Sequence, residues 1–465
     1  MTGSELGTDT RSISQKKWRR YPRYKDSGVE WLREIPEGWE IKKIKHTTYV
    51  KGRIGWQGLR SDEFIDDGPF LVTGTDFNDG SINWATCYHV SEKRYEEDPY
   101  IQLQENDLLL TKDGSIGKTA IVKNLPGKAT LNSGLFLTRL KNKAYSTKFM
   151  YYLFNSNVFS SFIEFKKMGT TISHLYQNVF VEFSYPLPRS LEQNAIITFL
   201  DRETARIDAL IAKKERQIEI LQEKRAALIS HAVTKGLDPS VPMKDSGIEW
   251  LGSIPCHWEI ILLKYLSCVQ TGIAKGKDLT GKEVIEIPYL RVANVQDGFL
   301  DLSDITTIEI EPHEIHRYSL KKGDILMNEG GDEDKLGRGT IWNEEITPCI
   351  HQNHVFAVRP FDLSNSMWID LITLSDYAKF YFLVNAKKTT NLASISATNI
   401  SQLPVIFPPK EERFQILNYI QEQERGLQIA MRKIKSSIEK LTEYRSSLIS
   451  AAVTGKIDVR QEVTI

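Results

Sequence analysis

The sequence predicts an α+β protein: two β-rich domains of one fold, separated by two long antiparallel helices that form a coiled coil, with an internal pseudo-twofold repeat. Three observations predict this fold class. Residues 25–40 recur as residues 244–259, with 11 of the 16 positions identical. Residues 225–238 recur as residues 445–458. A long segment with helical composition precedes each copy of that second motif, so the chain is a tandem duplication with a period of about 220 residues.

The bulk composition limits where a binding surface can lie. Lys plus Arg number 60 and Asp plus Glu also number 60, so any nucleic-acid surface must be local. The four cysteines form no CxxC pair, which suits a reducing cytosol. No apolar run reaches the roughly 18 residues of a membrane span, and the start of the chain lacks the apolar core of a signal peptide. We therefore expect a cytoplasmic protein with a flexible N-terminal tail over residues 1–20.

The first repeat is expected to hold a β-rich domain over residues 21–186 and a helical spacer over residues 187–240. Short runs such as DLLLT and TAIV, punctuated by glycine, are typical of strands. Between residues 191 and 233 there is no proline or glycine; Pro188 precedes the segment and Gly236 follows it. A helix of these 43 residues would be about 64 Å long, which is too long for the core of one small domain.

The second repeat is expected to hold a β-rich domain over residues 241–406 and a helical spacer over residues 407–465. Its strand-like runs include DILM and HVFAV. Framework positions match those of the first domain: Asp107 corresponds to Asp324, and Arg139 corresponds to Arg359. The stretches between such positions differ, and differences between two copies of one fold usually lie in functional loops.

Both predicted helices carry one apolar seam at alternating steps of four and three residues, which is typical of coiled-coil packing. An ordinary amphipathic helix buried on its own domain is the alternative, and two copies in register argue against it. An arginine interrupts both seams at the same place. The predicted seam residues are Ile207, Ile211, Ile218, Leu221, Arg225 and Leu228 in the first helix, and Leu427, Met431, Ile434, Ile438, Leu441, Arg445 and Leu448 in the second.

Motifs that could indicate an enzyme are incomplete. GSIGKT resembles a phosphate-binding loop, but Lys112 stands where that motif needs glycine. Glu333 and Lys335 have a spacing found in metal-dependent nucleases, although a solvated loop is the simpler explanation. Cys349, His351 and His354 have metal-ligand spacing, but alternation along a strand explains it better. The sequence thus predicts no catalytic residues and no metal site, and a stand-alone nuclease stays open as an alternative.

Basic and polar residues recur in equivalent loops of the two domains, and this mixture suits DNA. Lysine and arginine bind phosphates, while asparagine, serine and threonine bind phosphates or base edges. The predicted DNA-binding residues are Lys112, Ser115, Lys118, Lys166, Lys167, Thr170 and Thr171 in the first domain, and Arg291, Asn328, Lys335, Arg338, Lys388, Thr389, Thr390 and Asn391 in the second.

Six segments carry a resemblance to a known family: YPRYKDSGVEWLREIPEGW, KDSGIEWLGSIPCHW, KGDILMNEGGDEDKLGRGTIW, TTNLASISATNISQLPVIFPPKEER, LISHAVTKGLD and LISAAVTGKID. On these segments the chain resembles the specificity subunit of a Type I DNA restriction-modification system. The resemblance implies two target recognition domains that each read one half of a split, asymmetric DNA site. It also implies that the helical spacers hold these domains at a fixed separation.

The same resemblance implies the partners. Two methyltransferase (modification) subunits would dock on the helices, and restriction/translocase subunits would join that core. S-adenosylmethionine, ATP and Mg²⁺ are then expected on those partner subunits, none of them bound by this chain. A system whose single partner carries both methylation and cleavage stays open as an alternative.

Overall fold

In the computed structural model the chain divides into two units. Unit 1 comprises residues 1–214 and 435–465, and unit 2 comprises residues 215–434. Both long helices contribute to both units, α7 (Ser190–Lys235) and α12 (Lys410–Val453). The structure describes residues 18–53, 59, 61–141, 143–167, 174–276, 278–331, 336–388 and 393–462.

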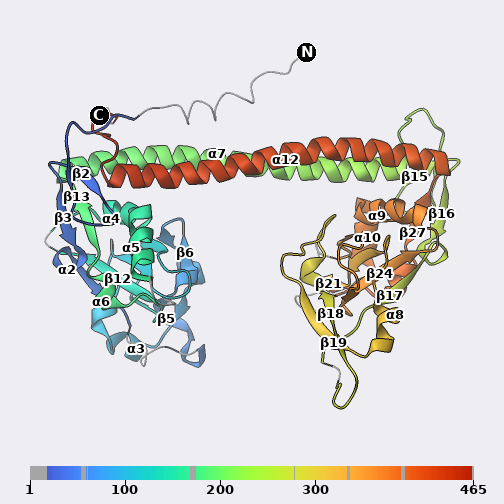
Figure 1. The fold of residues 1–465 in the computed structure, drawn as a ribbon, viewed down its shortest axis with the longest axis horizontal. Helices are drawn as coiled ribbons and strands as arrows, with labels where there is room; N and C mark the ends of the chain where they lie inside the picture. The colour runs from blue at the N-terminus through green and yellow to red at the C-terminus, as the bar shows by residue number, and fades with distance from the viewer. Residues whose placement is uncertain are drawn as a thin grey trace. The chain divides into compact units, whose positions relative to one another are not determined.

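Unit 1 is built on a four-stranded antiparallel sheet with the order β10-β9-β12-β4 and a three-stranded sheet with the order β11-β5-β8. Figure 1 labels β12 of the first sheet and β5 of the second. The run LLLT becomes β9, a strand with neighbours on both sides, and all four of its residues are buried. The strands are β1 (Tyr24–Asp26), β2 (Glu34–Pro36), β3 (Glu40–Lys43), β4 (Thr48–Lys51), β5 (Ile65–Val72), β6 (Phe77–Asn78), β7 (Ser81–Ile82), β8 (Tyr88–His89), β9 (Leu108–Thr111), β10 (Thr119–Ile121), β11 (Ala129–Leu131), β12 (Leu135–Leu140) and β13 (Ser184–Leu187).

The helices of unit 1 cover its sheets and join the first part of α7 to the last part of α12. Ile207 of α7 and Leu441 and Leu448 of α12 belong to one hydrophobic cluster, which also contains Phe149 and Phe162. The helices before α7 are α2 (Ile44–Thr47), α3 (Glu92–Glu96), α4 (Thr147–Phe154), α5 (Asn157–Lys167) and α6 (Gln177–Phe180).

Unit 2 repeats this strand arrangement. Its four-stranded sheet has the order β22-β20-β24-β17, and its three-stranded sheet has the order β19-β18-β23. A further three-stranded sheet, β21-β26-β25, pairs residues next to the loop that follows β20. The strands are β14 (Met243–Asp245), β15 (Ser253–Pro255), β16 (Glu259–Leu262), β17 (Ser267–Thr271), β18 (Ile285–Leu290), β19 (Thr306–Ile310), β20 (Ile325–Asn328), β21 (Gly330–Gly331), β22 (Gly339–Ile341), β23 (Ile350–His351), β24 (Val355–Pro360), β25 (Lys387–Lys388), β26 (Ala393–Ser394) and β27 (Pro404–Phe407).

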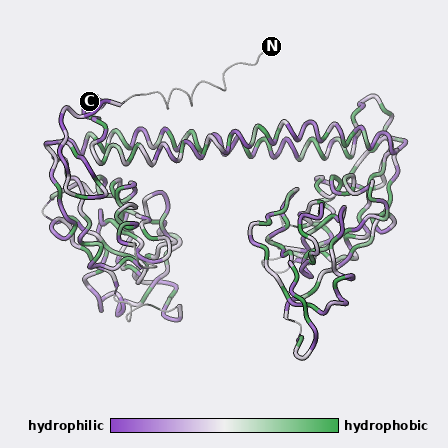
Figure 2. The backbone as a smooth tube through the Cα atoms, in the orientation of Figure 1, coloured by the Kyte–Doolittle hydropathy of each residue, from purple (hydrophilic) through white to green (hydrophobic). Residues whose placement is uncertain are grey.

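The helices of unit 2 pack in the same way. Ile229 of α7 and Ile416 and Ile420 of α12 share one hydrophobic cluster with Trp258 and Trp368. Figure 2 shows hydrophobic residues recurring along both long helices. The shorter helices are α8 (Ile315–Tyr318), α9 (Ser366–Leu374), α10 (Asp376–Val384) and α11 (Ala397–Ser401).

Two glycines end the long helices at equivalent places. Gly236 has φ +78° and Gly455 has φ +70°, a conformation that other residues rarely adopt. A Cβ on Gly455 would lie 3.2 Å from Trp39, and a Cβ on Gly236 would lie 3.3 Å from the equivalent Trp258. The backbone conformation therefore favours glycine at both helix ends, and at Gly455 a Cβ would also lie only 2.4 Å from Pro36 Cγ.

A buried ion pair recurs in the two domains. Arg139 binds Asp107 through Nε at 2.6 Å and Nη2 at 2.7 Å. Arg359 binds Asp324 through Nε at 2.7 Å and Nη2 at 2.6 Å. Each aspartate also accepts a backbone N–H three residues earlier, at 2.7 Å and 2.8 Å. These matched framework positions hold the start of β9 and of β20 in the same geometry.

Candidate nucleic-acid interface

The loop after β9 in unit 1 and the loop after β20 in unit 2 start from the same backbone frame. The N–H of Lys112 donates to Gly134 O at 2.9 Å, and Lys112 O accepts from Leu175 N at 2.8 Å. In unit 2, Glu329 makes the equivalent bonds to His354 and Ile395, both at 2.9 Å. Lys112 and Glu329 thus occupy the same place with opposite charges.

Lys112 is buried, unlike most predicted DNA-binding residues that the structure describes. Its Nζ lies 5.2 Å from the centre of the Phe136 ring, and burial lowers the pKa of its ammonium group. The side chain lies against Phe136 of β12, an interior strand of the four-stranded sheet. This arrangement makes Lys112 part of the packing beneath the loop.

Ser115 and Lys118 are exposed at the tip of that loop. The Thr111 hydroxyl donates to Ser115 O at 2.5 Å and accepts from Lys118 N at 3.0 Å. These two bonds fix the loop backbone, so the two polar side chains project from a defined turn. An exposed lysine on a fixed loop has the chemistry of a phosphate contact.

Asn328 is only 3% exposed and serves the internal structure of unit 2. Its Nδ2 donates to Val295 O at 2.9 Å and to Val292 O at 3.4 Å. Its Oδ1 is buried without a hydrogen-bond partner. The side chain therefore ties β20 to the turn after β18.

Arg291 and Arg338 lie at two different places in unit 2. Arg291 Nη2 pairs with the exposed Asp304 at 2.8 Å. Arg338 is half-buried and lines a pocket of about 470 Å³ together with Arg225 of α7 and Lys379 of α10. Asp297 also lines this pocket and forms an ion pair with Lys379 at 3.4 Å.

The other predicted residues lie at the ends of helix α5 and strand β25. Lys166 is exposed, with its Nζ 5.7 Å from the centre of the Phe165 ring. Lys167 ends α5, and Lys388 is exposed at the end of β25. The DNA-binding role of every predicted residue stays a prediction. Thr170, Thr171, Lys335, Thr389, Thr390 and Asn391 lie outside the described residues.

One acid–histidine pair lies at each of these loops, and neither pair was predicted from the sequence. In unit 1, His174 Nδ1 is hydrogen-bonded to Asp113 Oδ1, and the two residues form an isolated β-bridge. In unit 2, His354 Nδ1 is hydrogen-bonded to Glu329 Oε2 at 2.5 Å. Asp113 and His174 are 61 positions apart in sequence, so no local sequence motif could predict their contact.

The histidine and cysteine spacing near residue 350 does not gather metal ligands. His351 is buried with Nδ1 2.6 Å from Val355 O, whereas His354 pairs with Glu329. Within the described part of the chain, no group of three or more histidine, cysteine and acidic residues could hold a metal ion. Glu333 and Lys335 lie outside the described residues.

All thirteen predicted seam residues are buried or half-buried in their units. The two seam arginines each meet an acid on the other long helix. In unit 1, Arg445 Nε lies 2.8 Å from Asp208 Oδ1. In unit 2, Arg225 Nε lies 2.6 Å from Glu424 Oε1. The arginines therefore interrupt the apolar contact with specific ion pairs.

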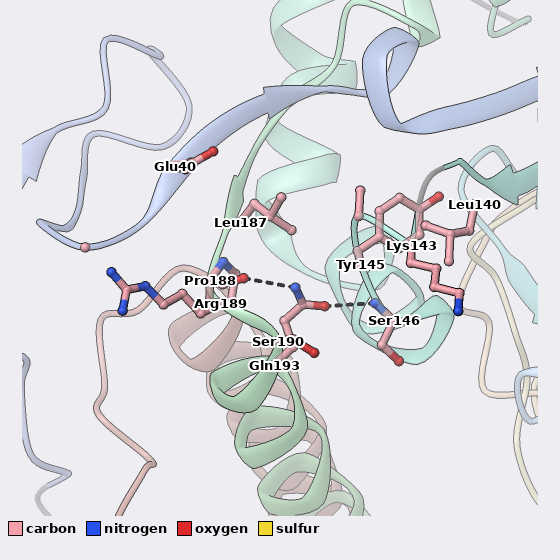
Figure 3. A pocket seen from close by; sticks show the side chains of 12 residues that line it. Glu40, Leu140, Lys143, Tyr145, Ser146, Leu187, Pro188, Arg189, Ser190 and Gln193 are labelled. Atoms are coloured by element: carbon pink, nitrogen blue, oxygen red, sulfur yellow. Dashed lines mark hydrogen bonds between the residues drawn. The ribbon is translucent and has the colours of Figure 1, made fainter.

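A polar pocket at the start of α7 in unit 1 contains none of the predicted site residues (Figure 3). Gln193 spans it: Ser146 N donates to Gln193 Oε1 at 2.8 Å, and Gln193 Nε2 donates to Pro188 O at 2.9 Å. Gln193 is 4% exposed, and its two bonds join the start of α4 to the turn before α7. We assign this pocket a structural role.

Known proteins resemble this chain over most of its length. Residues 36–220 match the family model described as a Type I restriction modification DNA specificity domain. The EcoKI specificity subunit of Escherichia coli K12 is 21% identical over 433 residues, covering 91% of this chain and 90% of the relative. The MjaVIII specificity subunit of Methanocaldococcus jannaschii is 25% identical over 435 residues, covering 92% and 94%.

The fold also matches a solved structure. A chain from a structure of a Type I restriction-modification system superposes with a TM-score of 0.60 at 15% identity, covering 91% of this chain and 99% of that chain. That likeness concerns the fold alone. The sequence matches show that residues 36–220 carry a Type I restriction modification DNA specificity domain, and that the chain is similar to Type I specificity subunits over about nine-tenths of its length.

Proposed function

We propose that this chain is the sequence-specific DNA-binding specificity subunit of a Type I restriction-modification complex. Each unit would read one half of a bipartite, asymmetric target. The observation that carries the proposal is that the two units share one strand order, yet the loops after β9 and β20 present different side chains. One scaffold with two loop chemistries suits two different half-sites.

The long helices would serve the assembly of the complex. We propose that α7 and α12 form an antiparallel coiled coil around a pseudo-twofold axis. The contacts between α7 and α12 within each unit, and the matching seam arginines, support this arrangement. Residues 21–186 and 241–406 would then be the target recognition domains, and residues 187–240 and 407–465 the spacers on which two methyltransferase subunits dock.

The chemistry would belong to the partners. Methyltransferase subunits would supply S-adenosylmethionine, and restriction/translocase subunits would supply ATP and Mg²⁺ chemistry. The chain itself would confer the target sequence and would act in the cytoplasm, on cellular DNA. Among the described helices, none combines the length and the apolar character needed to cross a membrane.

Methylation-sensitive sequencing tests the proposal. Cells that express this chain with the methyltransferase subunit of the same restriction system are compared with cells that express the methyltransferase alone. We expect a modified, asymmetric, two-part motif that appears only with this chain. A soluble complex that methylates no such motif would contradict the proposal.

A further inference from the structure

We propose that the two acid–histidine pairs, Asp113–His174 in unit 1 and Glu329–His354 in unit 2, are base-reading elements, one for each half-site. The proposal rests on the DNA-recognition function proposed above and assigns its reading atoms. Each histidine would accept a hydrogen bond from the exocyclic amino group of an adenine or a cytosine.

Both pairs sit at the same point of the fold. The backbone of residue 112 in unit 1 is hydrogen-bonded to residues 134 and 175. The backbone of residue 329 in unit 2 makes the same two bonds, to residues 354 and 395. In unit 2 the histidine comes from position 354, where unit 1 has Gly134. In unit 1 it comes from position 174, and the β-bridge between residues 113 and 174 corresponds to the one between Gly330 and Ser394.

The two histidines therefore come from opposite flanks of a strand end that the two units share. A Cβ built on Gly134 would lie 3.8 Å from Asp113 Oδ2, so a side chain at that position points toward the acid of unit 1. Gly330 and Ser394 occupy the positions of Asp113 and His174, so among the described residues these two positions of unit 2 carry no acid–histidine pair. The acid–histidine pair thus has a different position on the shared fold in each domain. Such a difference suits two domains that read different half-sites.

The hydrogen bond to the carboxylate determines which ring nitrogen faces outward as an acceptor. A carboxylate only accepts, so Nδ1 carries the hydrogen and Nε2 of the neutral ring presents a lone pair. In the major groove, an acceptor pairs with the N6 amino group of adenine or the N4 amino group of cytosine.

Exposure fits this role. The side chains of His174 and Asp113 are 33% and 42% exposed, and those of His354 and Glu329 are 56% and 28% exposed. Tyr176, which is 60% exposed, packs its ring edge-on against His174, with ring centroids 4.7 Å apart. Asn353 Nδ2 lies 3.3 Å from His354 Nε2 and donates to it when Nε2 is the acceptor, so a base amino group would take the place of this amide. Each imidazole is held at two sides while part of its surface stays open to a ligand.

The test is methylation sequencing of the full chain co-expressed with its methyltransferase subunit, for the variants His174→Ala and His354→Ala. Each variant should lower the preference at one base pair of one half-site by about tenfold, which is within the usual cost of a mismatched contact. The other half-site should be unchanged. His46→Ala, an exposed histidine of α2, is the matched control in unit 1. His257→Ala removes another acid–histidine pair, with Glu412 at 2.7 Å, and is the control in unit 2.

Variants of the acids separate reading from loop stability. Asp113→Ala should lower the preference at the same base pair as His174→Ala. Asp113→Asn retains an oxygen acceptor for Nδ1 and should restore much of that preference. If the pair only stabilised the loop, the variants would lower methylation at all sites and leave the base preference unchanged. That result would overturn the proposal.

An oligonucleotide measurement tests the atom itself. The base identified by His174→Ala is replaced by a purine or pyrimidin-2-one that lacks the exocyclic amino group. The wild-type complex should then bind as weakly as the variant binds the normal base, and the variant should show no further loss. If the wild-type chain directs methylation to a clear motif that neither histidine variant alters, this inference fails alone. If the wild-type chain directs no motif, the proposed function fails as well.

Discussion

At the scale of single residues, His351 makes the stability of unit 2 sensitive to acid. Burial lowers the pKa of this imidazole from 6.5 to about 4, and its Nε2 has no hydrogen-bond partner. Between these two values the unfolded chain binds a proton that the folded chain excludes. Stability from this group is therefore complete above pH 6.5 and is lost progressively as the pH falls toward 4, by at most about 3 kcal/mol.

The variant His351→Leu tests this effect, because unit 1 has the buried Leu131 at the equivalent position. Thermal unfolding of the wild-type chain and the variant is compared from pH 7.5 to pH 4. The difference between their melting temperatures should move in favour of the variant as the pH falls. A difference that stays constant over this range would show that His351 is not the titrating group.

Lys118 and Lys112 lie on one loop but are expected to act differently. Lys118 is exposed, so Lys118→Ala should weaken DNA binding about equally for all sequences and lower the salt dependence by about one phosphate contact. Lys112→Met keeps an unbranched side chain over Phe136 and should leave the salt dependence unchanged. Binding isotherms of the methyltransferase complex over a salt series measure both effects, and equal slopes for all three proteins would contradict the assignment.

At the scale of the helices, the two seam ion pairs should differ in importance. Arg225 and Glu424 have side chains only 23% and 18% exposed, and Asp370 lies in the same charged environment. Burial raises the pKa of Asp370 to about 7, an effect that Arg225 opposes. Arg225→Leu would leave Glu424 poorly solvated and unpaired, so we expect a loss of about 1 to 3 kcal/mol in the free energy of unfolding.

Arg445→Leu is the comparison, because Arg445 is 33% exposed and its partner Asp208 is 50% exposed. Its loss should be at most about 1 kcal/mol, as for other solvent-exposed pairs. Denaturant unfolding measures both variants, and the double variant Arg225→Leu with Glu424→Leu should recover part of the loss. Neither arginine variant should change the methylated motif, and a changed motif would indicate a direct role in recognition.

The sequence predicted the helical segments well because their signal is local and repeated. The proline- and glycine-free segment 191–233 lies within α7, Ser190–Lys235, and the seam residues are shielded in both units. The loop residues were harder to interpret. Lys112 and Asn328 look like surface residues in sequence, yet Lys112 is buried against Phe136 and Asn328 is buried against the turn after β18. The acid–histidine pairs need contacts between distant segments, which one sequence does not contain.

At the scale of the whole molecule, the two domains join their helices at equivalent points. In unit 1, β3 pairs with β13 immediately before α7, and in unit 2, β16 pairs with β27 immediately before α12. Ser450 of α12 accepts the N–H of Asn157 at 2.8 Å, and Ser230 of α7 accepts the N–H of Asp376 at 2.8 Å. A domain moved from one unit to the other would therefore meet an equivalent strand pair and an equivalent serine contact.

This equivalence predicts the behaviour of a chimera in which residues 41–186 replace residues 260–406, the segments that the register of the two strand pairs makes equivalent. The chimera keeps the strand pair and the serine contact at its junctions. In the chimera, Met150 replaces Asp370 in the environment of Arg225. Lys148 pairs with Asp201 at 2.6 Å in unit 1, but in the chimera it faces Gln421 at the equivalent position. We expect a folded but less stable protein whose methylated motif contains the first half-site twice.

Methylation sequencing of cells that express the chimera with the methyltransferase subunit measures this outcome. The wild-type chain in the same cells identifies both original half-sites. If unit 2 reads its half-site through its own loops, the second half-site disappears and the first appears in its place. If the second half-site persists, its specificity comes from the helices or from the partner, and the assignment of one half-site to each domain is wrong. Gln421→Asp, which restores the acid that faces Lys148 in unit 1, should raise the melting temperature of the chimera and leave its motif unchanged.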